Sequence, residues 1–275
     1  MCITSAKAKL SKTRIMSMAL DNGRHLMSYS NKVKNESGKT NSMILAIPGK
    51  LKKEWFMDTT NYNKFLENIE DQAHLEYDEI HGIYSRGLSF NSKGFDRFSL
   101  GMYDILIAED IREIIERLDS IGPEIDTELV TFFETQYKGW SFVLCIFDGN
   151  EEMDSQPVTF EYEPFHYNWL YFPTMDSHSG GAPSFIHPIK MDHTLIYEYP
   201  GLTDRVTNNV EFSQEVPEIL KRRNYVATKW DSTLPNGDMY ISLDELKKRA
   251  SDKKFCYDGF KRQLSHPEVR IFSKV

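Results

Sequence analysis

Cysteine is scarce in this chain: Cys2, Cys145 and Cys256 are the only three among 275 residues. Scattered cysteines in odd number are typical of a reducing compartment and exclude a disulfide scaffold. Long apolar runs are also missing, because no stretch approaches the roughly 18 uncharged apolar residues of a membrane-spanning helix. The first residues carry several Lys and Arg side chains without a continuous apolar core, which argues against secretion. We therefore expect a cytoplasmic protein with no membrane segment.

Motifs that hold common cofactors are absent as well. The sequence has no CxxC pair, Walker loop, GxGxxG or HExxH motif, so no cofactor is expected. A formal net charge of -8 and a pI near 5.6 argue against nucleic acid as a partner, since binding to phosphates depends on Lys and Arg. What remains is a globular composition, with 40% apolar residues and enough length for one large domain or one domain with an appendage.

The N-terminal part of the chain predicts a β-meander. Residues 3–10, 24–30 and 42–47 have strand-like patterns, and Asp21-Asn22-Gly23 is a strong hairpin signal. Residues 141–147 are apolar at nearly every position, as in a central strand covered on both faces, so Cys145 is predicted to be an inert core thiol. Further strands are expected at 158–163, 168–172 and 194–199.

Helical spacing of apolar residues predicts helices at 62–73, 106–119 and 124–136, with a long loop or edge hairpin at 82–101. Strand groups on both sides of these helices predict an α+β fold, in which helices cover a sandwich of antiparallel sheets. After Pro200 the chain has more charge, and helices are expected at 214–223, 243–250 and 255–263. We divide the chain into an α+β domain at 1–204 and a C-terminal helical or mixed elaboration at 205–275.

Cys2 has the most distinctive chemistry in the sequence. Aminopeptidases commonly remove an initiator Met that precedes a small residue, which would leave a thiol and a free α-amine on Cys2. An unperturbed cysteine thiol has a pKa of about 8.5 and an α-amine one of about 7.7 to 8.0, so the amine can accept the thiol proton near neutral pH. One residue would then supply both a nucleophile and its base. The alternative is an ordinary residue at a frayed terminus.

The opening of the chain resembles the N-terminal-nucleophile hydrolase superfamily. The resemblance lies in Met1-Cys2 leading directly into a strand, the Asn22-Gly23 hairpin, the return strand that ends at Tyr29-Ser30-Asn31, and the third strand at 42–47. It implies a four-layer αββα fold and a cysteine amidohydrolase or amidotransferase-like enzyme that acts on a small-molecule or peptide amide. By the same resemblance, Cys2 is the nucleophile, Asn31 donates to the oxyanion or the amine, and Arg14 holds the amine or an anionic substrate.

A second group of candidate residues lies further along the chain. His166, Asp176, His178 and His193 fall close together in sequence, around a Gly180-Gly181 loop, and are candidates to line a substrate cleft. An alternative is a metal site made by His178, His187 and His193, because imidazole and carboxylate groups bind transition metals. The structural explanation is a loop whose histidines make ordinary hydrogen bonds.

Aromatic residues are dense between positions 160 and 172. They predict either a platform for stacking rings or simply core packing. Two other function classes therefore stay open beside the amidohydrolase. One is a non-enzymatic binding or regulatory protein that acts on a protein partner, for example as an inhibitor. The other is a metal-dependent hydrolase that uses the histidines and aspartates of residues 166–193.

Overall fold

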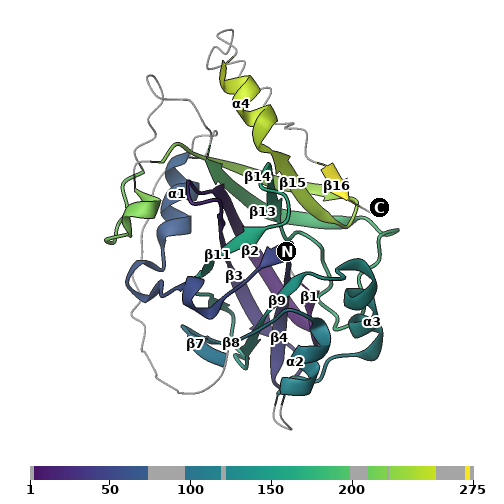
Figure 1. Cartoon of the computed structure of the whole chain (residues 1–275). Coiled ribbons are helices and arrows are strands. Elements are labelled where there is room, and N and C mark those ends of the chain that lie inside the picture. The colour runs from purple at the N-terminus through teal and green to yellow at the C-terminus, as the bar shows by residue number, and fades with distance from the viewer. Residues whose placement is uncertain are drawn as a thin grey trace.

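A computed structural model gives the fold of this chain and describes residues 3–73, 97–118, 122–198, 210–221, 223–251 and 270–272 (Figure 1). Among these residues, eight strands form the larger of the two main sheets. Its central path follows the order β14-β13-β2-β3-β11-β5, with β10 beside β3 and β6 beside β11. The strands are β2 (Ala8–Ala19), β3 (His25–Asn35), β5 (Gly49–Lys50), β6 (Phe56–Met57), β10 (Met153–Asp154), β11 (Val158–Pro164), β13 (Ile189–Glu198) and β14 (Tyr225–Leu234).

The second main sheet has the order β1-β4-β9-β8-β7 and is antiparallel throughout. Its strands are β1 (Ile3–Thr4), β4 (Asn41–Ile47), β7 (Arg97–Leu100), β8 (Tyr103–Ala108) and β9 (Ser141–Phe147). In the larger sheet, β13 and β2 form a parallel pair, and all its other pairs are antiparallel. A third, small sheet joins β12 (Trp169–Phe172), β15 (Asp238–Ser242) and β16 (Arg270–Phe272).

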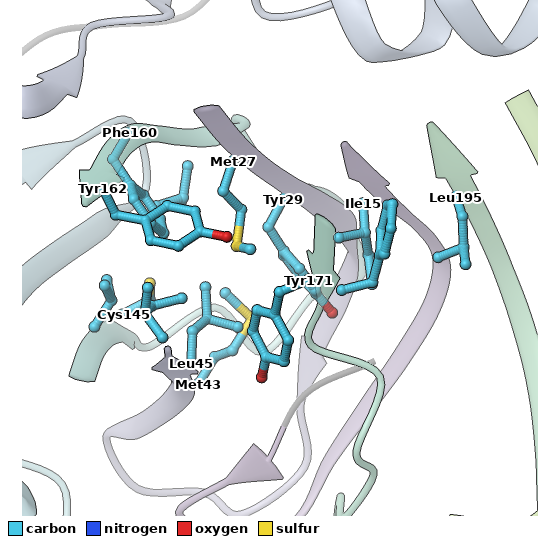
Figure 2. Close-up of a cluster of buried hydrophobic side chains, with 14 of the residues drawn as sticks. Ile15, Met27, Tyr29, Met43, Leu45, Cys145, Phe160, Tyr162, Tyr171 and Leu195 are labelled. Atoms are coloured by element: carbon cyan, nitrogen blue, oxygen red, sulfur yellow. The ribbon is translucent and has the colours of Figure 1, made fainter. Parts of the chain in front are cut away.

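The two main sheets pack face to face because the strands of both are apolar on their inner faces. From β4, Met43, Leu45 and Ile47 point into the shared core, whereas Ile44 and Ala46 point outward. The strand β9 alternates in the same way. Figure 2 shows the core between the sheets, where Ile15, Met27 and Tyr29 of the larger sheet lie across from Met43, Leu45 and Cys145 of the smaller one. Cys145 is fully buried, as predicted.

Helices cover the outer faces of both sheets. On the smaller sheet, α2 (Ile111–Arg117) and α3 (Thr127–Gln136) bury Ile114, Leu129 and Phe133 against the outward side chains of β4, β8 and β9. On the larger sheet, α1 (Phe65–Ala73) packs on the outward residues of β2 and β13. Figure 1 shows α1 on the opposite side of the molecule from α2 and α3. The order of layers is helix, sheet, sheet, helix, so the expected α+β sandwich with αββα layering is confirmed.

Several element predictions are confirmed by the backbone. The β2–β3 hairpin turns where Asp21-Asn22-Gly23 predicts it: the Leu20 amide donates to the Arg24 carbonyl at 2.8 Å, and Gly23 has φ +80°. The strands predicted at 42–47 and 141–147 match β4 and β9, and the helix predicted at 124–136 contains α3. Of the long loop or edge hairpin predicted at 82–101, only residues 97–101 are described, and they contain β7, which pairs with β8 at the edge of the smaller sheet.

Other element predictions need correction. The run 3–10 is not one strand, because β1 ends at Thr4 and pairs with β4, whereas β2 starts at Ala8 in the other sheet. The helix predicted at 106–119 begins only at Ile111, since residues 103–108 form β8 between β7 and β9. Asp110 is the N-cap of α2 and accepts from the Arg112 amide at 2.8 Å, which fixes where the helix starts.

The C-terminal region contains more strand than expected. Residues 225–234 form β14, which pairs with β13 over ten positions at the edge of the larger sheet. The short 3-10 helix η3 (Glu218–Leu220) occupies part of the helix predicted at 214–223, α4 (Leu243–Ser251) confirms the next, and 255–263 lies outside the described residues. The boundary at residue 204 stays a prediction, although β14 and β15 both pair with strands that precede it. Within the described ranges, no helix is long and apolar enough to cross a membrane.

Candidate functional site

Arg14 lies on the outer face of the larger sheet, where α1 packs. Its guanidinium Nε is 2.5 Å from Oε2 of Glu70, and Nη1 is 3.4 Å from Oε1 of Glu67. The other Glu70 oxygen accepts from the Thr194 hydroxyl at 2.5 Å. Only 13% of the Arg14 side chain is exposed. Both carboxylates come from the helix, so Arg14 connects β2 to α1.

Asn31 lies on the opposite face of the same sheet. It shares the inner face of β3 with Tyr29 and Val33, and its amide nitrogen is 3.8 Å from the sulfur of Met43 on β4. Its backbone amide donates to the Ser155 hydroxyl at 2.9 Å, and its side chain is buried. Because Arg14 and Asn31 are on opposite faces of the sheet, the structure does not bring these two predicted catalytic residues together. Cys2 lies outside the described residues.

Asp176 and His178 are neighbours in the loop between β12 and β13. This loop contacts the N-terminal strands β1 and β2. Nε2 of His178 is 2.9 Å from Oδ1 of Asp176. The Asp176 backbone exchanges two hydrogen bonds of 2.8 Å with the side chain of Asn236. Backbone bonds from Thr4 to Ser177 and from Ala8 to His178 fix the other side of the loop. These contacts agree with the alternative in which Asp176 and His178 belong to a structural loop held by ordinary hydrogen bonds.

His193 lies on β13 and is fully buried. Its Nδ1 accepts from the Asp192 amide at 3.2 Å, while Nε2 has no hydrogen-bond partner among the described residues. Burial holds the pKa of His193 well below its usual value, and the nearby His178 lowers it further. The imidazole is therefore neutral. His187 is exposed, and within the described part of the chain no three metal-binding side chains come together, so the arrangement of His178, His187 and His193 gives no support to the proposed metal site.

A cleft of about 410 Å³ lies where α3, the 164–169 turn and the third sheet meet. Of the predicted cleft residues, His166 lines it, whereas Asp176, His178 and His193 are not among its lining residues. Most of the walls are aromatic or apolar. The lining residues are Pro48, Thr135, Gln136, Tyr137, Trp140, Pro164, Phe165, His166, Trp169, Met175, Phe185, Asp238 and Tyr240.

Asp238 is the only carboxylate among those lining residues, and it is buried. Its Oδ1 accepts from the backbone amides of Thr174 and Met175, each at 3.0 Å, and its Oδ2 accepts from the Tyr137 hydroxyl at 2.7 Å. Burial raises the pKa of Asp238; hydrogen bonds from Met175, Tyr137, Tyr171 and Thr174 oppose that rise. These donors hold the carboxylate in one position beside the cleft.

The sequence predicted only part of this cleft. It noted the aromatic density at 160–172, and the structure divides those residues between two roles: Phe160, Tyr162 and Tyr171 are core, whereas Phe165 and Trp169 line the cleft. Tyr137 and Asp238 were missed because they are 101 positions apart, and no local pattern links them.

The arrangement defines a layered α+β sandwich with an aromatic cleft beside a buried carboxylate. No family model matches this chain, and no curated protein matches it. Among solved structures, a crystal structure of baculovirus P35 has a TM-score of 0.47 and 13% identity over 88% of this chain and 92% of that chain. A mutated baculovirus P35 after caspase cleavage has a TM-score of 0.46 and 12% identity over 85% and 98%. The caspase-8/P35 complex gives 0.40 and 14% over 85% and 88%.

These comparisons correct the expectation of a hydrolase. The three structures named above are of P35, described after caspase cleavage or in a complex with caspase-8, and none of the three is described as a hydrolase. The positions of Arg14 and Asn31 on opposite faces of one sheet agree with this correction. The role of Cys2, and the resemblance that it carries, stay predictions.

Proposed function

We propose that this chain is a non-enzymatic binding protein that engages a partner protein through the aromatic cleft. The proposal is based on the positions of the exposed large apolar side chains in this chain. Three of the five exposed large apolar residues of the described structure lie on the two segments that flank the cleft: Phe165 at 46%, Tyr167 at 39% and Ile186 at 86%.

Such a surface has the composition of a protein interface. Aromatic residues are enriched at interfaces, and Trp and Tyr contribute the largest binding energies when a partner covers them. Exposed apolar side chains gathered in one place mark interaction sites more often than isolated ones do. Here Phe165 lines the cleft, and Tyr167 and Ile186 are next in sequence to its lining residues His166 and Phe185. The walls of the cleft also include Trp140, Trp169 and Tyr240. Part of the cleft wall comes from β12, β15 and the end of α3, and the rest comes from the segments that connect such elements.

The proposal is tested by binding measurements with matched variants. The double variant Phe165→Ser with Ile186→Ser removes apolar surface beside the cleft. The control Ile115→Ser with Met153→Ser removes two exposed apolar side chains elsewhere, at 37% and 38% exposure. Caspase-8, with which P35 is described in a complex, is a defined protein to try first. Calorimetry with the purified chain would give the affinity for each double variant.

We expect the cleft double variant to weaken binding at least about tenfold, because buried apolar anchors each contribute more than 1 kcal/mol. The control double variant should bind like the unmodified chain. If caspase-8 does not bind, a photo-crosslinking residue at position 165 or 153 identifies other partners in the same comparison. Equal losses from both double variants, or equal adducts at both positions, would argue against the cleft as the contact surface.

A further inference from the structure

The strand β14 is the longest open edge in the described structure. It is the last strand on its side of the larger sheet and pairs with β13 over ten positions, from Tyr225 to Leu234. The strands that end the other sheet edges, β1, β5, β7, β12 and β16, are only two to four residues long. Short edge strands are one way in which proteins avoid pairing with other chains. The edge of β14 does not have this protection.

The outer edge of β14 is also free of other backbone contacts. No described residue makes a backbone hydrogen bond to it apart from the ladder with β13. The strand contains no proline, and its ladder with β13 has no bulge. A long row of N–H and C=O groups without partners is a template for one more strand.

The charged residues of β14 are one of each sign. Lys229 and Asp231 are both exposed and lie on the outer face of the sheet, the face on which Ala227 packs. The residue opposite Asp231 on β13 is Asp192, so two carboxylates face each other across the ladder. Among the described residues neither carboxylate has an ion pair with Lys or Arg, and the His193 imidazole beside Asp192 is neutral. Like charges directly opposite each other are unfavourable, so a cation is needed on the free side of Asp231.

We propose that β14 pairs with β14 of a second copy of this chain, antiparallel and about a two-fold axis at Trp230. In this register Lys229 of each copy lies opposite Asp231 of the other. Each Asp231 then has a cation on its free side and Asp192 on the other. On the inner face Val226 lies opposite Leu234 of the other copy, and both are apolar. A two-fold axis is the usual symmetry of two identical partners.

The charges also select this register over its neighbours. Opposed residues must lie on the same face of the sheet, so the strands can slip only in steps of two residues. One such step centres the pair on Lys229 and puts two lysines opposite each other. The step in the other direction centres it on Asp231 and puts two aspartates opposite each other. Both are repulsive, whereas the Trp230 register has two attractive contacts.

A second copy therefore fits this edge better than an unrelated strand. Any extended peptide can satisfy the backbone groups, but β14 itself has a lysine and an aspartate at the spacing that this edge requires. The Trp230 ring is half-buried and would meet Trp230 of the other copy, and Trp is enriched at protein interfaces. The inference goes beyond the proposed function, because β14 contributes no lining residue to the aromatic cleft.

The test is a charge swap on the complete chain, followed by sedimentation equilibrium. The unmodified chain should show a reversible equilibrium between monomer and dimer. Lys229→Glu puts two acids opposite each other at both symmetric contacts, and Asp231→Lys puts two lysines there. Each single variant should weaken the dimer at least about tenfold. A mixture of the two single variants has opposite charges at both contacts again, so it should form a heterodimer, and the double variant Lys229→Glu with Asp231→Lys should recover self-association.

Lys39→Glu is the matched control, because it makes the same change of charge at an exposed residue outside β14 and should leave the dimer unchanged. Amide hydrogen exchange locates the contact: amides of 226–234 that do not donate to β13 should gain protection as the concentration rises. If a thermal melt shows that a variant does not fold, exchange in the unmodified chain decides. The proposal is overturned if the unmodified chain stays monomeric up to millimolar concentration, or if a dimer forms without protection in β14. It is also overturned if folded single variants do not associate on mixing, or if Lys39→Glu weakens the dimer as much as Lys229→Glu does.

Discussion

The hydroxyl of Tyr137 donates a 2.7 Å hydrogen bond to the carboxylate of Asp238, across 101 positions of sequence. Tyr137 is the C-cap of α3, and Asp238 is the first residue of β15. Burial raises the pKa of Tyr137 well above its usual value, and the adjacent charge of Asp238 raises it further. One buried contact thus joins the helical layer to the third sheet where both border the aromatic cleft.

Tyr137→Phe should destabilise the protein by about 1 to 3 kcal/mol, because it leaves a buried carboxylate short of one donor. Tyr225→Phe is the matched control: its hydroxyl is also buried but donates to the neutral carbonyl of Leu220 at 2.8 Å. Its loss should be about 1 kcal/mol. Urea denaturation of both variants gives the comparison. Equal losses would show that the charge of Asp238 adds nothing to the Tyr137 bond.

Because His25 is buried, we expect the free energy of unfolding to fall in acid. It is buried on β3, with Nε2 2.9 Å from the Tyr167 carbonyl oxygen and Nδ1 3.3 Å from the Tyr162 hydroxyl. Burial lowers the pKa of His25 from 6.5 to about 4, against the opposing bond to Tyr167. The unfolded chain therefore takes up the proton first, so stability is complete above pH 6.5 and is lost as pH falls towards about 4.

The shift corresponds to about 3 kcal/mol of unfolding free energy, from roughly 1.4 kcal/mol for each pKa unit. Urea denaturation across this pH range measures it. His25→Gln keeps an N–H donor for Tyr167 but does not titrate, so its stability should vary less with pH. His193, whose pKa is also lowered by burial, would supply the slope that remains. A variant with the same pH dependence as the unmodified chain would contradict the assignment to His25.

Much of the layered fold follows from local patterns in the sequence. The strands at 42–47 and 141–147 are apolar at consecutive positions because each is covered by a sheet on one face and by helices on the other. The region of β8 was harder to predict, since Ile107, Ile111 and Ile114 have helical spacing across a strand and a helix. Pairing of β8 with β9 decides in favour of the strand as far as Ala108. Long-range pairing of this kind has no local signal.

The candidate site was less predictable than the fold. Arg14 and Asn31 are both polar residues in strands near the N-terminus, and sequence alone does not tell which face of a sheet each one occupies. The shift in register between Ser11 and Arg14, where Lys12 has φ +51°, changes the facing of the residues around it. The cleft draws residues from distant segments, so only the aromatic part at 165–169 was visible as a pattern.

The placement of Arg14 can be tested through stability. Arg14→Met keeps most of the aliphatic stem but removes the charge that faces Glu67 and Glu70, so we expect a loss of about 1 to 3 kcal/mol in urea denaturation. Lys39→Met is the control, because Lys39 and Glu124 pair in solvent with 71% and 85% of their side chains exposed. It should change stability by less than about 0.5 kcal/mol. A loss for Arg14→Met as small as the control would contradict the connection to α1.

The loop that carries Asp176 and His178 also packs closely on Ser5 and Ala6, between β1 and β2, at Gly180. This glycine has φ +89°, and a Cβ atom there would come within 2.9 Å of the Ser5 carbonyl oxygen and 3.0 Å of the Ala6 Cα. Gly23 has a similar φ of +80° but open space around it. Both glycines have a positive φ, but only Gly180 has neighbouring backbone atoms where a Cβ atom would be placed.

Gly23→Ala should therefore cost about 1 kcal/mol, for the left-handed conformation alone. Gly180→Ala should cost about 2 to 4 kcal/mol, because steric overlap with Ser5 and Ala6 adds to the same strain. Urea denaturation of both variants measures the difference. Amide hydrogen exchange at Thr4 and Ala8, which donate to Ser177 and His178, should accelerate only in Gly180→Ala. Equal losses, or unchanged exchange at Thr4 and Ala8, would show that the loop does not pack against the N-terminal strands in this way.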